Sequence, residues 1–223
     1  MSILLNSIII KKPLSALIEG LKPENTIHIN LSATNKELRL LDLKNTEVFT
    51  KYIEEYLSRN KADYAIGGYN ENREIYQRSN HFDTAEESRC IHLGIDVWTK
   101  EWTPVFSPLN GTIHSLKDNN NFGDYGPTII IQHEIDGQKF HLLYGHLSQS
   151  SLNLNNKGDK VEAGALVGYI GPYPENGDWP PHLHFQMILD MQGHTGDYPG
   201  VCKKLEATAY LKNCIDPSIF LMV

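Results

Sequence analysis

The sequence predicts a mainly β protein, an antiparallel β-sheet or sandwich preceded by a small α/β extension. From about His81 onward, short apolar and β-branched runs alternate with turn signals, which is typical of an antiparallel β domain. Before that point, one segment has helical periodicity and another is strand-like. We therefore expect an N-terminal extension at residues 1–80, with a strand, a helix and a polar loop, and a β domain at residues 81–223.

In the extension, a strand is expected at residues 26–33 and an amphipathic helix at residues 45–60. The helix is indicated by apolar residues that recur on one side with helical spacing. These residues are Val48, Phe49, Tyr52, Ile53, Tyr56 and Leu57. Asn45 or Thr46 suits the N-cap, because its side-chain oxygen can accept a hydrogen bond from a backbone N–H of the first turn. The glycine-bearing stretch at residues 67–73 is expected to be a polar loop.

In the β domain, the expected strands are short and regularly spaced. They lie at residues 105–106, 112–116, 128–132, 139–144, 160–161, 166–170 and 182–189. Asp136 and Gly137 form a hairpin-turn signal between the third and fourth of these strands. The chain contains no tandem repeat and no low-complexity tract.

Composition restricts the partners of the protein. The chain has 223 residues, 40% of them hydrophobic, and a formal net charge of −7, as expected for a globular protein with one substantial core. Nucleic acid is not expected as a partner, because binding it requires clustered Lys and Arg, and no basic run occurs. The three cysteines form no Cys-x-x-Cys pair, which excludes a disulfide scaffold. The sequence does not indicate the oligomeric state.

The N-terminus gives an expectation about the compartment. Residues 1–12 are apolar but have no basic start and are interrupted by Asn6 and Ser7, so they do not resemble a secretory signal. No stretch approaches the roughly 20 apolar residues that span a bilayer, so no membrane insertion is expected. The sequence as given predicts a cytoplasmic protein, or a periplasmic or secreted one if a leader has been removed.

Two stretches place metal-type ligands at every second residue, with apolar residues between them. The stretches are His92-Leu-Gly-Ile-Asp96 and His182-Leu-His184-Phe. In an extended chain the ligands of each stretch share one face and the apolar side chains share the other. Two such strands side by side would bring three imidazoles and a carboxylate together, which predicts a zinc site.

The chemistry of such a site follows from what zinc requires. Catalytic zinc has three protein ligands and one open position for water. His92, Asp96 and one of the pair His182 and His184 would supply the ligands, and the other histidine could take a proton from the activated water. His146 follows the strand at residues 139–144 and could donate to the oxyanion that forms at a carbonyl, or it could have a structural role.

Other candidates are weaker, because they lack paired ligand spacing. Cys90 lies two residues before His92 and is a conceivable fourth ligand, although a small buried thiol is the commoner outcome. The remaining histidines are expected in structural or solvent-exposed positions. They are His28, His81, His114, His133, His141 and His194, of which His133 and His141 flank a hairpin near the expected cleft.

Most of residues 88–190 resemble the lysostaphin-like, or LytM-domain, zinc metallopeptidases. The resemblance depends on the two ligand stretches and on Tyr144-Gly-His146-Leu-Ser148 between them. It implies the fold known as a duplicated hybrid motif. It also implies that His92, Asp96 and His184 bind zinc, that His182 is the general base, and that His146 assists the oxyanion.

The same resemblance implies the reaction but leaves the substrate open. Members of the family cleave peptide bonds, often in the peptide cross-links of bacterial peptidoglycan. The stretch that leads into His182, residues 171–181, is longer and more aromatic than the usual turn of the family. Two alternatives therefore remain: a hydrolase of the same fold that acts on a small intracellular peptide or metabolite, and a non-catalytic regulatory or binding module.

The loop at residues 67–73 has two possible roles. It could belong to an extension that only packs against the domain and covers a sheet edge. Alternatively, Tyr69, Asn70 and Arg73 could reach the cleft, as a wall for the substrate or as an arm whose Asn contacts the metal. The positions of Asn70 and Arg73 relative to the ligands distinguish the two.

Overall fold

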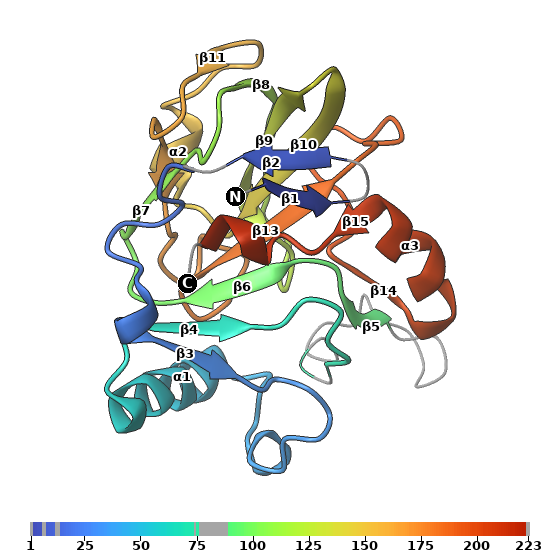
Figure 1. Cartoon of the computed structure of the whole chain (residues 1–223). Helices are drawn as coiled ribbons and strands as arrows, with labels where there is room; N and C mark the ends of the chain where they lie inside the picture. Colours follow the sequence, from blue (N-terminus) through green and yellow to red (C-terminus); the bar gives the residue numbers. More distant parts are fainter. Residues whose placement is uncertain (1, 6–7, 12–13, 74, 76–88, 222–223) are drawn as a thin grey trace.

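The architecture is a large β-sheet with short helices around it (Figure 1). The computed structural model describes residues 2–5, 8–11, 14–73, 75 and 89–221. Within them, a nine-stranded sheet has the order β11-β8-β9-β10-β13-β6-β4-β3, and β15 pairs with β13 beside this path. The prediction of a mainly β fold is confirmed. The predicted domain boundary between residues 80 and 81 lies outside the described residues.

The elements follow in chain order. The strands are β1 Ser2–Leu5, β2 Ile8–Lys11, β3 Thr26–Ile29, β4 Tyr64–Gly67, β5 Arg89–His92, β6 Ile95–Trp98, β7 Pro104–Phe106, β8 Gly111–Asn119, β9 Gly126–Ile135, β10 Gln138–Gly145, β11 Lys160–Val161, β12 Leu166–Tyr169, β13 His182–Ile188, β14 Val201–Lys203 and β15 Cys214–Ile215. The α-helices are α1 Thr46–Asn60, α2 Gln149–Leu152 and α3 Ala207–Asn213. Short 3-10 turns lie at Pro23–Asn25, Leu38–Leu40, Lys204–Glu206 and Ser218–Leu221.

The strands predicted for the β domain correspond to β7 to β13, with small shifts at their ends. Their pairing is antiparallel throughout. At the predicted hairpin turn, Asp136 and Gly137 have positive φ angles of 50° and 79°, as a two-residue type I′ turn requires. The sequence analysis missed β14, β15, α2 and α3 in this part of the chain, and β1, β2 and β4 before it, which are short elements without a periodic pattern.

The stretch around His92 differs from the prediction, because it forms two strands and not one. β5 ends at His92 and pairs with β14, whereas β6 begins at Ile95 and pairs with β13. The break falls at Leu93 and Gly94. A Cβ on Gly94 would lie 2.7 Å from the backbone oxygen of Phe185, so the chain passes β13 more closely here than any other residue allows.

The N-terminal segment extends the same sheet. β4 pairs antiparallel with β6, and β3 pairs with β4 in the one parallel pairing of the described sheet. Figure 1 shows β6, β4 and β3 in succession, with α1 packed against them. The helix begins as predicted, since the side chain of Asn45 accepts hydrogen bonds from the backbone N–H groups of Glu47 and Val48. The predicted strand at residues 26–33 is shorter and ends at Ile29.

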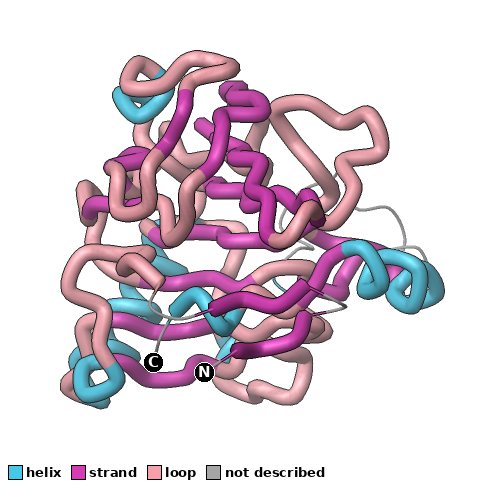
Figure 2. The backbone as a smooth tube through the Cα atoms, turned by 45° about the horizontal axis from the view of Figure 1, so that its top comes forward, coloured by secondary structure: helices cyan, strands magenta, loops and turns pink. Residues whose placement is uncertain are grey.

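Along β6 and β13, every second side chain packs in the hydrophobic core. Ile95 and Val97 of β6, with Leu183, Phe185 and Met187 of β13, belong to the main hydrophobic core. The residues between them point to the opposite face of the sheet. A second core lies between α1 and the strands β3, β4 and β6. The smooth trace in Figure 2 shows the loops that connect these strands at the ends of the sheet. No helix among the described residues is long and apolar enough to cross a membrane.

One predicted structural histidine couples the stability of this core to pH. His133 is 1% exposed and stacks on Phe140. Its Nδ1 donates to the backbone oxygen of Asn110, while its Nε2 has no partner among the described residues. Burial lowers the pKa of His133 to about 4 from the ordinary histidine value of 6.5. The unfolded chain therefore binds a proton between these pH values that the folded chain does not, and stability falls as the pH drops through this window.

We expect His133→Phe to reduce this loss of stability. Between pH 7 and pH 5 the wild type should lose about 2 kcal/mol more of its free energy of unfolding than the variant does. Urea unfolding at the two pH values measures the difference. Equal losses in both proteins would show that His133 is protonated as readily in the folded chain as in the unfolded one.

Candidate metal centre

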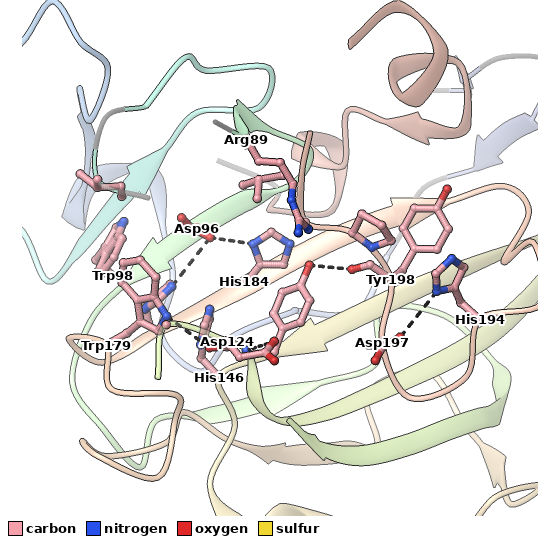
Figure 3. A pocket seen from close by; sticks show the side chains of 17 residues that line it. Arg89, Asp96, Trp98, Asp124, His146, Trp179, His184, His194, Asp197 and Tyr198 are labelled. Atoms are coloured by element: carbon pink, nitrogen blue, oxygen red, sulfur yellow. Dashed lines mark hydrogen bonds and ion pairs between the residues drawn. The ribbon is translucent and has the colours of Figure 1, made fainter. Parts of the chain in front are cut away.

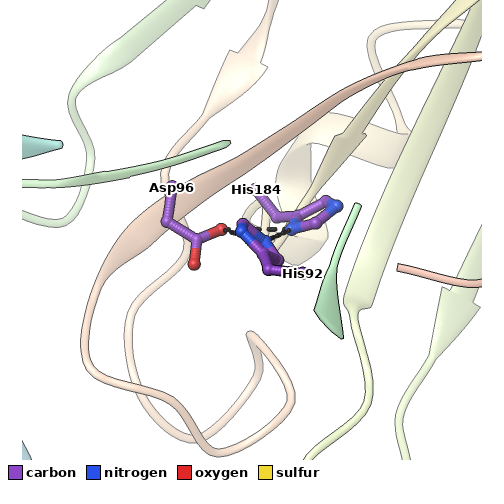
Figure 4. A group of neighbouring side chains, drawn as sticks. All are labelled: His92, Asp96 and His184. Carbon is purple, nitrogen blue, oxygen red and sulfur yellow. Dashed lines mark hydrogen bonds and ion pairs between the residues drawn. The ribbon is translucent and has the colours of Figure 1, made fainter. Parts of the chain in front are cut away.

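The register of β6 and β13 places the predicted ligands side by side. His184 lies opposite Asp96, and His182 lies opposite Trp98. His92 reaches the same point from the end of β5, where its backbone N–H donates to the oxygen of Glu71. Figure 4 shows the side chains of His92, Asp96 and His184 converging. Among the described residues these three form the group that could hold a metal ion.

The ligand atoms are spaced as a metal ion would require. His92 Nε2 is 3.0 Å from His184 Nδ1, and Asp96 Oδ1 is 3.1 Å from His184 Nδ1 and 3.3 Å from His92 Nε2. Bonds of 2.0–2.1 Å in tetrahedral geometry would separate ligand atoms by about 3.3 Å. The three atoms therefore form one face of a tetrahedron of suitable size.

Hydrogen bonds on the outer side of each imidazole determine which nitrogen faces the centre. His92 Nδ1 lies 2.9 Å from the backbone oxygen of Gly68, and a carbonyl oxygen can only accept. In the neutral ring Nδ1 therefore has the proton and Nε2 points its lone pair inward. His184 Nε2 lies 2.9 Å from Oε1 of Gln186, which leaves the Nδ1 lone pair of His184 facing the centre.

Hydrogen bonds of the amide nitrogen fix the orientation of the Gln186 side chain. Its Nε2 donates to the backbone oxygen of Pro199 and to the sulfur of Cys214, so its Oε1 must face His184. Partners of this kind fix the tautomer of a metal-binding histidine and strengthen it as a ligand. Two nitrogen lone pairs and a carboxylate oxygen are thus aimed at one point, and this donor set fits a divalent cation.

Burial keeps His92, His146 and His182 neutral. It lowers the pKa of His92 and of His182 to about 4, and it lowers that of His146 well below the usual range. For Asp96, burial would raise the pKa, but the nearby His92 and Arg73 outweigh burial and hold the pKa well below its usual range. Asp96 is therefore a carboxylate and His92 a neutral imidazole, which are the protonation states that bind metal.

His182 lies beside the ligand group with one nitrogen available. Its Nδ1 donates to the backbone oxygen of Pro180 at 2.8 Å, so the Nε2 of the neutral ring is an acceptor. This Nε2 is 3.9 Å from Asp96 Oδ1. The ring stacks on Trp98, with 3.9 Å between centroids and 18° between planes. Packing and hydrogen bonding thus fix the ring with its acceptor nitrogen toward the ligands.

His146 is positioned by a sharp turn at the end of β10. Its φ angle of 60° lies in the left-handed region of backbone conformation, which residues other than glycine seldom adopt. The turn is held by a bond from the His146 N–H to the oxygen of Tyr125, and the ring Nδ1 donates to the oxygen of Asn176. Its centroid lies 4.2 Å from that of His182. The five predicted site residues are therefore brought together.

A pocket of about 260 Å³ opens at this cluster. It is lined by Asp96, His146, His182 and His184, together with aromatic and charged residues (Figure 3). Trp179 contacts both His146 and His182 edge-on, at 6.0 and 6.1 Å between centroids. His194, expected to be structural or exposed, lines the far part of the pocket with Asp197.

Two alternatives from the sequence are decided by the structure. Cys90 is not in the ligand group among the described residues, and its side chain packs in a small apolar cluster, which was the favoured alternative. The side chain of Asn70 is exposed and does not belong to the ligand group or to the pocket lining, although its backbone N–H donates to the oxygen of His92. From the same loop, Arg73 does reach the site and pairs with Asp96. His81 lies outside the described residues.

Sequence reasoning missed several residues that support the site. Gln186 carried a signal, because it lies on the same strand face as His182 and His184. Asn176 and Trp179 carried none, since their roles arise from a loop that folds back on itself. There the side chain of Asn176 bonds the backbone oxygens of Gly171 and Trp179.

The fold and the site together define a class: a β-sheet protein with a buried centre of two histidines and one carboxylate, and two further imidazoles at an open pocket. Three protein ligands with an open position are typical of catalytic metal sites. Comparison with known proteins adds a family match. Residues 90–195 match the model described as Peptidase family M23.

Individual relatives are distant. A protein described as an uncharacterized metalloprotease, from Haemophilus influenzae, is 28% identical over 99 residues, which are 44% of this chain and 19% of that protein. The chain thus matches about a fifth of the length of this curated relative. The catalytic domain of the antimicrobial peptidase lysostaphin, from Staphylococcus simulans, is 20% identical over 78% of this chain and 98% of that chain, with a TM-score of 0.45. A zinc-containing peptidase from Vibrio cholerae is 24% identical over 48% of this chain and 29% of that chain, with a TM-score of 0.38.

The role of Gln186 is testable. We expect Gln186→Leu to weaken metal binding about 10- to 100-fold, because His184 loses the acceptor that fixes its tautomer. A competition titration with a chromogenic chelator measures the affinity. Met187→Leu, on the core face of the same strand, is the control and should bind metal as the wild type does. Equal affinities in all three proteins would mean that the bond to Gln186 does not orient His184.

Proposed function

We propose that this protein is a zinc-dependent peptidase that hydrolyses a peptide bond, with His92, Asp96 and His184 as the zinc ligands. One observation carries the proposal: three inward-facing donor atoms converge at tetrahedral spacing within the residues that match the M23 family model, beside two histidines with acceptor nitrogens. Zinc bound there would polarise a carbonyl group and make water a nucleophile near neutral pH.

His182 is the general base in this proposal. Its Nε2 is an unprotonated acceptor that faces the ligand group, so it can take a proton from the attacking water and later give that proton to the leaving amine. Trp98 and Pro180 hold the ring in place. The low pKa of the buried ring means that the proton, once taken, is readily passed on.

His146 assists at the carbonyl oxygen, and its tautomer adds a condition. Because Nδ1 donates to Asn176, the neutral ring has no proton at Nε2. His146 can donate to an oxyanion only after Nε2 has taken up a proton. A negative charge that develops on the nearby oxygen favours this uptake, since an opposite charge raises the pKa of an imidazole.

The substrate class proposed is a peptide of the kind that cross-links bacterial peptidoglycan, and a small intracellular peptide or metabolite is the alternative. A non-catalytic binding module is less favoured, because the described residues leave His146, His182 and His184 lining an open pocket. The pocket also has aromatic walls at Tyr125, Trp179 and Tyr198, against which a peptide can pack.

We expect one variant to lose the metal and a second variant to retain the metal but lose activity. Purified protein should hold about one zinc per chain, and His184→Ala should lose it, because a three-ligand site then has two ligands. His182→Ala should retain zinc and lose about 100- to 10,000-fold in kcat, which is the range of a general base. Elemental analysis and turnover on one peptide measure the two effects. His28→Ala, at an exposed position, is the control and should resemble the wild type.

The substrate is tested by incubating the protein with purified cell-wall peptides and, separately, with a library of cytosolic peptides. Mass spectrometry of the products identifies the bond cleaved. Defined fragments from the cell-wall pool alone would support the proposed class, and fragments from the cytosolic pool alone would support the alternative. A wild type that holds no metal after zinc supplementation would contradict the peptidase proposal itself.

A further inference from the structure

A buried arginine lies directly behind one of the proposed zinc ligands. Arg73 is 1% exposed, and its Nη1 donates to Oδ2 of Asp96. Its Nε donates to Oε2 of Glu71 at 2.6 Å, and its Nη2 approaches the backbone oxygen of Gly68 at 3.5 Å. A buried guanidinium is costly unless it is fully paired, and here two carboxylates share it.

We propose that Arg73 is a positioning residue that makes Asp96 a ligand through one oxygen only. The inference rests on the zinc site of the proposed function. A carboxylate can bind a metal through one oxygen or through both. Arg73 occupies Oδ2, and Oδ1 alone faces the imidazole nitrogens of His92 and His184, at 3.3 and 3.1 Å. Because Oδ2 is bonded to Arg73 and does not bind the ion, the fourth position of a tetrahedral ion stays open for water.

Arg73 orients the carboxylate of Asp96 without adding net positive charge to the site. Glu71 pairs with the guanidinium at the side away from Asp96. The three groups together have a charge of −1, which is the charge that Asp96 would have alone. The attraction of the site for a cation is thus retained, while the guanidinium fixes which oxygen faces the ion, as the planar fork of arginine does with carboxylates.

The backbone around Arg73 keeps it in this place. The Arg73 N–H donates at 2.8 Å to the oxygen of Cys90, which lies in β5, the strand that ends at His92. Glu71 is anchored at its other oxygen, Oε1, by the N–H of Leu31. Gly67 leaves room for the guanidinium, since a Cβ there would lie 2.5 Å from Arg73 Nη2. The turn that carries Arg73 also supplies Gly68, whose oxygen fixes the tautomer of His92.

The test uses cobalt(II) as a spectroscopic substitute for zinc in the full chain. Tetrahedral cobalt absorbs visible light more strongly than five- or six-coordinate cobalt, because its environment is further from centrosymmetric. In Arg73→Met both oxygens of Asp96 become free to bind, so we expect a weaker and shifted visible band.

A second variant, Arg73→Lys, keeps the test valid if Arg73→Met does not fold. Arg73→Lys retains the buried charge, but a lysine cannot bond both carboxylates as the guanidinium does, so its band should be intermediate. If Arg73→Met does not fold, as judged by near-UV circular dichroism, Arg73→Lys gives the answer alone. Arg59→Met is the control, because Arg59 pairs with Glu37 at the exposed surface, and its cobalt spectrum should match the wild type.

The outcomes separate this inference from the proposed function. An unchanged cobalt spectrum in the folded Arg73 variants would overturn the inference, even if the affinity fell, because weaker binding alone is what a merely structural role would cause. A wild type that binds neither cobalt nor zinc would overturn the proposed function and this inference with it. A changed spectrum in the Arg73 variants, with Arg59→Met unchanged, supports the inference.

Discussion

The site depends on the antiparallel pairing of β6 with β13. This pairing sets His184 against Asp96 and His182 against Trp98, and on the opposite face it directs Phe185 and Ile95 into the main core. A slip of β13 by one residue would turn His182 and His184 toward the core and Phe185 toward the pocket. The hydrophobic core therefore fixes the position of the ligands, since burial of the apolar face permits only one register.

Around this pairing, backbone carbonyls orient the imidazoles. Gly68, Pro180 and Asn176 each accept a bond from the Nδ1 of one histidine, namely His92, His182 and His146. The carbonyls come from two loops: Gly68 follows β4, whereas Asn176 and Pro180 both lie in the loop between β12 and β13. In an interior of low dielectric an unpaired polar group is costly. Each of these backbone oxygens therefore requires a hydrogen-bond donor, and an imidazole Nδ1 supplies it. The inward direction of the lone pairs is thus a property of the folded loops as well as of the ligand residues.

Alternation, helical periodicity and turn chemistry were enough to predict β7 to β13, the helix α1, and a cluster of His92, Asp96 and the pair His182 and His184, because these signals are local. The choice of His184 as the ligand came from the family resemblance. The break between β5 and β6 was not predictable, since it results from the close passage of Gly94 past β13, a contact between distant parts of the chain. Arg73 lay in a loop that the sequence singled out, but its pairing with Asp96 depends on how β4 joins the sheet. Trp179 and Asn176 act through a loop whose conformation has no periodic signal.

The turn at Gly68 and Arg73 also changes how the limits of the domain should be drawn. The family match begins at residue 90 and ends at residue 195, but the partners of the centre extend beyond both ends, to Gly68 and Arg73 on one side and to Pro199 and Cys214 on the other. A fragment cut at the family limits would contain every ligand and Gln186, but it would lack the groups that orient His92, Asp96 and Gln186. The smallest unit that carries the intact chemistry is thus larger than the unit that sequence similarity defines.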